Sequence, residues 1–284
     1  MNIAVTGSSG HIGSAVAARL GRIARIIGLD RRPGPFTTQV GEIDDHQLVR
    51  EVVRGTDALV HTAGLHVPDL GKASAEQFRR VNVDATRELL EAARAAGVGR
   101  FVLLSTTSVY GCSSRSGPPA TWADEDLPPK PEDAYDRTKL DAEALCRAFA
   151  DARLSTVILR LARCFPEPAH EVAFYRLYRG VDRRDVADAH LRAVLAPMRG
   201  STTVNIAGPS PFEPGDMAAL WEDPWPVIER RVPGVRAGFE RRGWPLPGRI
   251  DRVYPIGKAT RELGYRPRFG ITELMREAAI ACSG

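Results

Sequence analysis

Residues 3–13 read IAVTGSSGHIG, in which a short apolar run leads directly into glycines at every third position. The apolar run predicts a buried strand, and residues 12–20 after it predict a helix. In a strand–turn–helix of this kind, Gly7 permits a sharp turn, Gly10 lets the backbone approach a pyrophosphate, and Gly13 lets the helix pack on the strand. The amides at the start of the helix would then face phosphate groups. This stretch therefore predicts a dinucleotide-binding unit.

The chain repeats this alternation of short apolar runs and amphipathic segments up to residue 206. Strands are expected at Ile3–Thr6, Ile26–Asp30, Ala58–Thr62, Phe101–Ser105, Thr156–Leu161 and Thr203–Ile206. Helices are expected at Ile12–Leu20, His46–Val53, Ala75–Ala96, Ala134–Ala152 and Asp185–Leu195. Apolar strands that alternate with helices indicate an α/β fold, a doubly wound parallel sheet with helices on both faces.

The composition changes in two places. Residues 111–131 contain five prolines, which predict a loop, and the chain beyond Gly208 is rich in proline and tryptophan and is expected to be irregular until a final helix, Ile271–Ala281. We therefore expect a Rossmann-type domain formed by residues 1–160 with 181–206. Residues 161–180 with 207–284 are expected to form a smaller substrate-binding lobe.

Asp30 stands at the end of the second expected strand, where a carboxylate accepts hydrogen bonds from the ribose hydroxyls of the adenosine half of a dinucleotide. A carboxylate there repels a 2′-phosphate, so Asp30 favours NAD over NADP. Arg31 and Arg32 favour the opposite choice, since a guanidinium beside the ribose can hold that phosphate. If both arginines are only solvated, NAD remains the expected cofactor.

Bulk properties exclude several classes of function. The formal charge is +4 from 39 basic and 35 acidic residues, and the arginines are interleaved with acids, which argues against a nucleic-acid surface. No apolar run approaches the roughly 20 residues of a membrane helix, and no basic leader precedes the first strand, so a cytoplasmic protein is expected. The four cysteines form no CxxC pair, so neither structural zinc nor a disulfide framework is expected and no metal is assigned.

Tyr135 and Lys139 stand four residues apart at the start of an expected helix. A phenol titrates near ~10 and must come down about three units, roughly 4 kcal/mol, to act as a base at neutral pH. An ammonium one helical turn away, together with the positive charge of an oxidised nicotinamide, is an adequate source of that shift. This pair therefore predicts proton transfer beside a bound dinucleotide.

Six segments, in order along the chain, resemble the extended short-chain dehydrogenase/reductase superfamily of epimerases, dehydratases and related reductases. They are TGSSGHIG (6–13), DALVHTAG (57–64), VNVDAT (81–86), FVLLSTTSVYG (101–111), YDRTK (135–139) and KATRELGYRPR (258–268). The resemblance implies a catalytic triad of Thr106, Tyr135 and Lys139, in which Thr106 orients the substrate oxygen and Tyr135 transfers its proton. Lys139 would lower the pKa of the phenol and bind the nicotinamide ribose.

The resemblance also implies a set of cofactor contacts in the first 140 residues. The implied contacts are Gly7, Ser9, Gly10, His11, Ile12, Gly13, Asp30, Arg31, Ile43, Thr62, Ala63, Gly64, Asn82 and Lys139. His61 lies at a strand end beside these residues, and for it we expect a structural role.

Departures from the family pattern bear on the substrate. Dehydratases of the family place an Asp-Glu pair after the catalytic Thr, where this chain has Thr107 and Ser108, so 4,6-dehydration is not expected. The segment after the strand that ends at Leu161 is short, which suits a small molecule or one sugar ring. Its C-x-P-E-P stretch is similar to uronate dehydrogenases, a resemblance that implies substrate contacts. The implied contacts are His66, Thr107, Ser108, Arg163 and Arg176.

Arg163 and Arg176 would together suit an anionic substrate, because a guanidinium holds a carboxylate bidentately. Alternatively, Arg163 pairs with Glu167 or Glu171 and Arg176 lies on the surface. The sequence thus predicts an NAD-dependent oxidoreductase of a small, sugar-like substrate, with an anionic sugar as one candidate, and the family resemblance implies a homodimer. An epimerase that retains its NAD, a non-catalytic dinucleotide sensor and a scaffold subunit remain as alternatives.

Overall fold

The computed structural model describes residues 1–246 and 248–281, with side chains up to residue 276. The chain forms two compact units. The first unit comprises 1–109, 131–160 and 186–204; the second comprises 110–130, 161–185 and the described part of 205–284. This division differs from the expected one chiefly at 110–130, the proline-rich loop, which belongs with the second unit.

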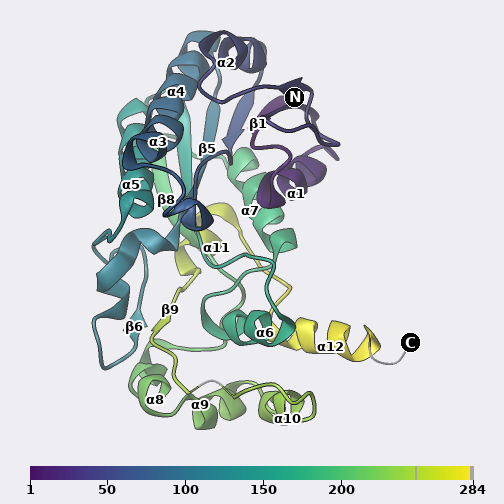
Figure 1. The fold of residues 1–284 in the computed structure, drawn as a ribbon, viewed down its shortest axis with the longest axis vertical. Coiled ribbons are helices and arrows are strands. Elements are labelled where there is room, and N and C mark those ends of the chain that lie inside the picture. Colours follow the sequence, from purple (N-terminus) through teal and green to yellow (C-terminus); the bar gives the residue numbers. More distant parts are fainter. Residues whose placement is uncertain (247, 282–284) are drawn as a thin grey trace. The chain divides into compact units, whose positions relative to one another are not determined.

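A seven-stranded sheet forms the centre of the first unit, in the order β3-β2-β1-β4-β5-β7-β8 (Figure 1). The strands are β1 (Asn2–Thr6), β2 (Arg25–Asp30), β3 (Gln39–Val40), β4 (Ala58–His61), β5 (Arg100–Thr106), β7 (Ser155–Leu161) and β8 (Ser201–Ile206). The ladders from β3 to β5 are parallel, and Thr6 at the end of β1 pairs with Leu29 and His61. The expected doubly wound α/β fold is confirmed. The carboxyl ends of these parallel strands therefore meet at one edge, where such folds bind ligands.

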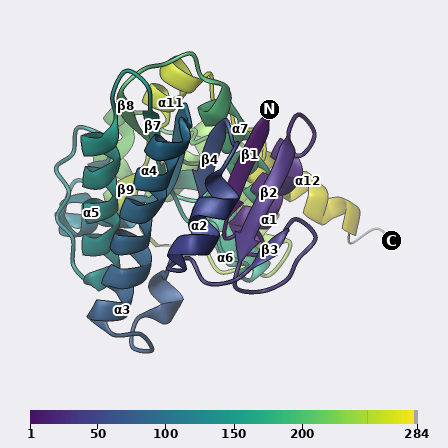
Figure 2. The same cartoon turned by 90° about the horizontal axis from the view of Figure 1, so that it is seen from above.

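Helices cover both faces of the sheet, as the two views show (Figures 1 and 2). They are α1 (His11–Leu20), α2 (His46–Val53), α3 (Ala75–Arg79), α4 (Ala85–Ala96), α5 (Ala134–Phe149) and α7 (Arg183–Leu195). The α2, α4 and α5 helices lie along one face, and a core that includes Leu59, Leu89, Phe101 and Ile158 fills the space beneath them. The expected single helix Ala75–Ala96 contains a π-helical turn, Arg80–Asp84, between α3 and α4.

The second unit is more regular than its proline content indicated. Its helices are α6 (Ala169–Tyr178), α8 (Met217–Glu222), α9 (Pro224–Arg231), α10 (Val235–Glu240), α11 (Gly257–Leu263) and α12 (Ile271–Ala281), with short strands β6 (Thr121–Trp122) and β9 (Arg252–Val253). The prediction of an irregular lobe was wrong for α8, α9 and α10. Trp225, Phe239 and Ile250 belong to the separate apolar core that these helices bury. Among the described residues no helix is both long and apolar enough to cross a membrane.

Candidate active site

The glycine loop joins β1 to α1 in the geometry that the sequence predicted. Gly7 has φ +73, and a Cβ on it would lie 2.7 Å from the backbone nitrogen of Ala63. A Cβ on Gly13 would lie 2.0 Å from the Gly7 carbonyl oxygen, so α1 packs too closely on the loop for any larger residue. A Cβ on Gly10 would meet only the Gly7 carbonyl oxygen, at 3.2 Å. The fold thus requires Gly7 and Gly13, whereas Gly10 is left open on its other side, as the approach of a ligand would need.

The Asp30 carboxylate is fixed by backbone amides. One oxygen accepts from Ser9 N at 2.9 Å and the other from Arg32 N at 2.9 Å. A carboxylate offers about four lone-pair sites, so this anchoring leaves acceptor capacity for ribose hydroxyls. Arg31 is exposed, and its guanidinium has no ion-pair or hydrogen-bond partner within 1–246 and 248–276. The acidic member of this pair is therefore held in place, and the basic one is solvated.

Ser9 is bonded within the protein, and its implied contact with a cofactor stays a prediction. Its amide binds Asp30, and its hydroxyl donates to the Arg32 carbonyl at 2.8 Å and meets Thr37 Oγ1 at 2.7 Å. Ser8 Oγ meets the same Thr37 hydroxyl at 2.7 Å. The polar groups of Ser9 thus tie the glycine loop to the segment after β2, and the loop keeps its shape through these internal bonds.

The loop after β4 lies against the glycine loop and is held from its other side by Asn82. Thr62 Oγ1 donates to the Thr6 carbonyl at 2.7 Å, which fixes this loop to the end of β1. Asn82 accepts from Leu65 N at 2.8 Å and donates to Leu65 O at 3.0 Å and to Thr138 Oγ1 at 3.1 Å. The buried Asn82 side chain, carried by the π-helical turn, therefore links the Thr62–Leu65 loop to α5 and acts as a positioning residue.

The remaining implied cofactor residues differ in exposure. Gly64 lies so near Asn82 that a Cβ on it would be 2.9 Å from Asn82 Oδ1. Ile43 is buried in the core beneath α2, whereas His11 at the start of α1 is exposed and Ile12 is half-buried. The contact of these residues with a cofactor remains a prediction.

The three triad residues meet at the carboxyl end of β5. Tyr135 and Lys139 occupy successive turns of α5, a helix that begins with the Asp133 carboxylate accepting from Asp136 N at 2.9 Å. The Tyr135 hydroxyl is hydrogen-bonded to Thr106, the last residue of β5. Lys139 Nζ donates to the Leu104 carbonyl at 2.6 Å. The structure therefore brings together the three residues that the resemblance assigned to the triad.

Burial dominates the electrostatics of the triad in the protein chain alone. It raises the pKa of Tyr135 to about 12, Asp136 and Asp133 act in the same direction, and only the hydrogen bond from Thr106 opposes them. Burial lowers the pKa of Lys139 to about 8, although the Glu143 carboxylate acts against that change. The lowering of the phenol's pKa by Lys139 together with an oxidised nicotinamide stays a prediction.

His61 has the structural role that was expected. It is 1% exposed, with Nδ1 2.7 Å from Thr6 Oγ1 and Nε2 3.1 Å from Thr86 Oγ1. Burial, and then the nearby charge of Lys139, lower the pKa of His61 to about 3, so the ring is neutral. A buried neutral imidazole with both nitrogens bonded pins β4 between β1 and α4.

The implied substrate residues of the first unit are partly engaged within the protein. Ser108 Oγ donates to Asp136 Oδ1 at 2.5 Å, and Ser108 N donates to Thr106 Oγ1 at 3.1 Å. Thr107 is 5% exposed, whereas His66 is exposed at the start of a short 3₁₀ turn. The Ser108–Asp136 bond orders the 3₁₀ turn that follows Thr106, so Ser108 is placed by α5 as well as by the end of β5.

The two implied substrate arginines lie in the second unit, and both are ion-paired there. Arg163 Nε donates to both Glu167 oxygens at 3.0 and 2.9 Å, which is one of the alternatives that the sequence left open. Arg176 is buried, not on the surface: it bonds the Phe269 carbonyl, and its Nη2 lies 2.9 Å from Asp182 Oδ2. An acid inside the unit therefore balances each charge.

Sequence analysis missed a third arginine of this segment. The Arg179 guanidinium lies 4.4 Å from the ring centroid of Tyr175 and 5.4 Å from that of Tyr178. Its Nε is buried without a partner, and no acid pairs with it in the part of the chain that the structure describes. Its position next to Gly180, at the end of the short segment that follows Leu161, gave no signal. Cation–π contacts hold this guanidinium in place while leaving its charge unbalanced.

No group of histidine, cysteine and acidic side chains within the described residues could hold a metal ion. Cys112, Cys146 and Cys164 are not joined in disulfides, and Cys282 lies outside the described residues. The site therefore consists of backbone amides, hydroxyls, one amine and carboxylates, a set that can hold phosphates and sugar hydroxyls and transfer protons.

Comparison with known proteins places this geometry among related enzymes. The family model of the "NAD dependent epimerase/dehydratase family" matches residues 3–171. A 3-beta-hydroxysteroid dehydrogenase of Mycolicibacterium neoaurum is 34% identical over 97% of this chain and 89% of its own length. A uronate dehydrogenase of Agrobacterium fabrum is 32% identical over 58% of this chain, a stretch that spans 62% of its own length. The solved structure of MoeE5 in complex with UDP-glucuronic acid and NAD has a TM-score of 0.71 and 27% identity and covers 97% of both chains.

Proposed function

Because the chain belongs to the NAD dependent epimerase/dehydratase family, we propose that it is an NAD-dependent oxidoreductase of a small, sugar-like substrate. The observation that carries this proposal is the arrangement at the end of β5. There Tyr135 is hydrogen-bonded to Thr106, one helical turn from Lys139, in the same unit as an intact glycine loop. A sensor or scaffold would have no use for a tyrosine and a lysine held in this way.

Gly7, Gly10 and Gly13 suit the pyrophosphate of NAD, and Asp30 suits its adenosine ribose. The fit rests on two features: the open side of Gly10 and the remaining acceptor sites of the anchored Asp30 carboxylate. Lys139 would bind the nicotinamide ribose. When bound, the nicotinamide supplies the hydride acceptor and donor. The anchored Asp30 and the solvated Arg31 support NAD in preference to NADP.

Tyr135 would transfer the proton of the reacting hydroxyl, with Thr106 placing the substrate oxygen. The raised pKa of the phenol in the chain alone means that Tyr135 carries its proton until a positive charge comes near it. A protonated phenol is the acid that reduction of a carbonyl requires, and oxidation of an alcohol requires the phenolate. Tyr135 would therefore serve as base only when the positively charged, oxidised nicotinamide is bound near it.

The substrate class is supported by the second unit and by the relatives. A uronate dehydrogenase and a UDP-glucuronic acid complex are both among the similar proteins, and each name contains a sugar acid. In this chain Arg179 carries a charge that no acid balances in the described residues, while Arg163 and Arg176 are paired. We therefore propose a substrate with a carboxylate or another anionic group, and we place Arg179 beside Arg163 and Arg176 as a candidate for holding it.

An epimerase that keeps its NAD is the second candidate. The description of the family names epimerases and dehydratases. Thr107 and Ser108 follow Thr106 in place of the Asp-Glu pair of the dehydratases, so of these two reactions epimerisation is favoured. We also propose a homodimer formed through α4 and α5. We propose a reducing compartment such as the cytoplasm, in keeping with Cys112, Cys146 and Cys164, none of which is joined in a disulfide.

The test is to supply the full chain with NAD and a panel of free sugars, sugar acids and sugar nucleotides while recording the absorbance of the reduced cofactor. Accumulation of reduced cofactor with a sugar acid supports the dehydrogenase. Conversion of a sugar nucleotide into its epimer without accumulation supports the epimerase. Binding of NAD with neither conversion across the whole panel would contradict both and leave a sensor.

A further inference from the structure

A row of three side chains joins α5 to the end of β5. Tyr135, Lys139 and Glu143 follow one another at intervals of four residues, so they lie on one face of the helix. Tyr135 is bonded to Thr106, Lys139 Nζ donates to Leu104 O at 2.6 Å, and Glu143 accepts from Ser105 Oγ at 2.6 Å. Three consecutive strand residues thus hold three successive turns of the helix. The third contact belongs to a residue without an assigned role.

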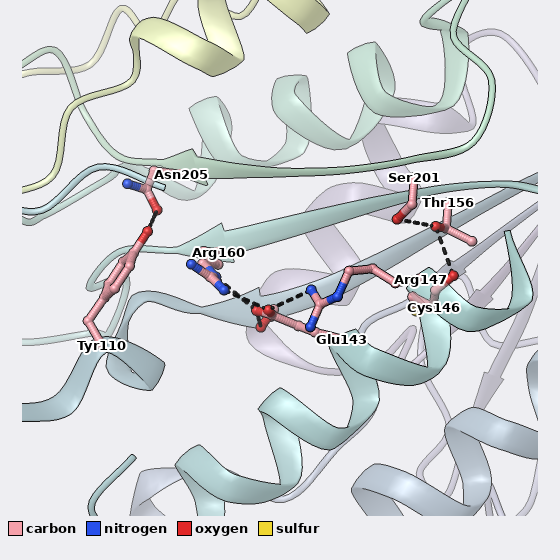
Figure 3. A network of polar contacts seen from close by, with 9 residues as sticks. Tyr110, Glu143, Cys146, Arg147, Thr156, Arg160, Ser201 and Asn205 are labelled. Atoms are coloured by element: carbon pink, nitrogen blue, oxygen red, sulfur yellow. Dashed lines mark hydrogen bonds and ion pairs between the residues drawn. The ribbon is translucent and has the colours of Figure 1, made fainter. Parts of the chain in front are cut away.

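Glu143 is 0% exposed and is one of the few carboxylates of the unit with no access to solvent. Arg160 of β7, 5% exposed, binds it through Nε at 3.0 Å and Nη2 at 2.8 Å, while the half-exposed Arg147 reaches it at 3.3 Å (Figure 3). A buried carboxylate in four polar contacts remains ionised, and the pKa of Glu143 is lowered by Arg160, Ser105 and Arg147 in spite of its burial. A fixed negative charge therefore stands one helical turn below Lys139.

We propose that Glu143 is a positioning residue for the Tyr135–Lys139 pair: it holds α5 in register on β5 and supplies the negative charge that keeps the Lys139 amine protonated. Burial alone disfavours the ammonium, and Leu104 offers it only one carbonyl oxygen. The ammonium is the form that can lower the pKa of a neighbouring phenol. Glu143 thereby acts on the reaction through Lys139 and does not touch the substrate.

The other ionisable groups around Lys139 do not replace this charge. His61 of β4 is neutral, with a pKa of about 3, and burial raises the pKa of Cys146 on α5, so neither carries a charge near neutral pH. Tyr135 is protonated in the chain alone. Arg160 of β7 and Arg147 of α5 are positive and act through their contacts with Glu143. Glu143 is therefore the residue that supplies a negative charge near Lys139.

This role rests on the proposed function, but the test can be made without a substrate. Lysine occurs only at 72, 130, 139 and 258, so carbon-labelled lysine side chains give four resonances in the full chain. The signal that is lost in Lys139→Arg identifies Lys139, and its shift against pH gives the titration midpoint. In the parent chain that midpoint is expected near 8, as burial lowers the pKa of Lys139 to about 8.

Glu143→Gln removes the charge but keeps a side chain that can still accept from Ser105. We expect the Lys139 midpoint to fall by about one pH unit or more, a tenfold change in the equilibrium constant. Arg147→Gln is the matched control: it removes a partner of the same carboxylate from the half-exposed side of α5, and the midpoint should stay within about 0.3 units. An unchanged midpoint in Glu143→Gln would overturn the proposal, whatever the substrate panel gives.

Glu143→Gln leaves Arg160 buried without a counter-charge, which can prevent folding. The double variant Glu143→Gln/Arg160→Gln removes both charges of the buried pair and replaces them with neutral side chains. It should fold and show the same fall in the Lys139 midpoint. A double variant that folds with the midpoint of the parent, or that does not fold at all, would assign Glu143 to stability alone and overturn the role.

Discussion

The two units hold the residues assigned to the site in different ways. In the first unit backbone groups hold two of them: Asp30 receives the amides of Ser9 and Arg32, and Lys139 donates to a carbonyl of β5. In the second unit side-chain charges hold each other, as Arg163 does with Glu167 and Arg176 with Asp182. A backbone contact fixes a side chain without cancelling its charge, whereas an ion pair cancels it. The difference favours the first unit as the place of the chemistry and indicates that the pairing of Arg163 and Arg176 contributes to the stability of the second.

The largest expected effect is a loss of turnover when a hydroxyl is removed from the first unit and not from the second. Tyr135→Phe removes the hydroxyl that transfers the proton, so turnover of whichever panel substrate is active should fall by about 10²–10⁴-fold. NAD binding should change by no more than about threefold, because the glycine loop and Asp30 are untouched. Steady-state kinetics and cofactor titration by fluorescence measure the two quantities.

Tyr265→Phe is the control, since it removes a buried hydroxyl that donates to Ala207 O at 3.0 Å in the second unit. It should cost about 1 kcal/mol of unfolding free energy and leave turnover unchanged. Retained turnover in Tyr135→Phe would assign the proton transfer to another group.

The second effect tests whether the second unit depends on its ion pairs. Arg176→Gln removes the buried partner of the Asp182 carboxylate, whose side chain is 13% exposed, but leaves it paired with the half-exposed Arg184, and should lower the free energy of unfolding by about 2 kcal/mol. Arg163→Gln, at a side chain that is 35% exposed, should cost about 1 kcal/mol or less. Urea denaturation of the three proteins gives the comparison. Equal losses would mean that the burial of the Arg176 pair is not what stabilises the unit.

An effect of similar size appears on acidification. Hydrogen bonds and charges from Arg184 and Arg176 lower the pKa of Asp182 to about 2 despite its partial burial, against 3.8 ordinarily. The folded carboxylate thus binds its proton less readily than the unfolded one, so this stabilisation is complete above about pH 4. It is lost as the pH falls toward 2, and amounts to about 2 kcal/mol.

Unfolding free energies measured at several pH values between 5 and 2 would follow this loss. In Arg176→Gln the dependence on pH should be shallower, because part of the cause of the shift is gone. A variant as steep as the parent in this range would trace the acid sensitivity to other carboxylates.

The smallest effect concerns cofactor choice in the first unit. Asp30→Ala should reduce the preference for NAD over NADP about tenfold, or about 1.4 kcal/mol, because the carboxylate no longer repels a 2′-phosphate. Dissociation constants for both cofactors give the ratio. Arg31→Ala in the Asp30→Ala background should then weaken NADP alone. A ratio that does not change in Asp30→Ala would mean that Arg31 or Arg32 sets the preference.

Much of the first unit could be predicted because its signals are local. Gly7 and Gly13 meet steric demands that only glycine satisfies, and Tyr135 and Lys139 share a helix face by periodicity alone. The π-helical turn at Arg80–Asp84 could not be predicted, since the bonds that favour it join Asn82 to Leu65 and Thr138. Those residues are distant in sequence, and no local pattern announces their contact.

In the second unit a usable signal was overlooked. Asp223 caps the start of α9 by accepting from Trp225 N at 3.1 Å, and Pro224 occupies the first helical position. An aspartate followed by proline is a typical helix start, but the high proline content of the region indicated irregular structure. The pairing of Arg163 with Glu167 was open to prediction from their four-residue spacing, whereas Asp182 as the partner of Arg176 depended on the turn after α6.

The sequence by itself determined the parallel α/β sheet and the turn that opens it, because each rests on periodicity or on steric limits within a few residues. Its resemblance to a known family, and not a local pattern, indicated the three triad residues. Only the tertiary structure decided which ionisable groups have shifted pKa values and which charges are paired. It placed Tyr135 and Lys139 where burial outweighs their mutual effect, set Glu143 beneath them with Arg160, and balanced Arg163 and Arg176 while leaving Arg179 unpaired. Burial and Coulombic interaction act through space between segments far apart in the chain, so residue order does not reveal them.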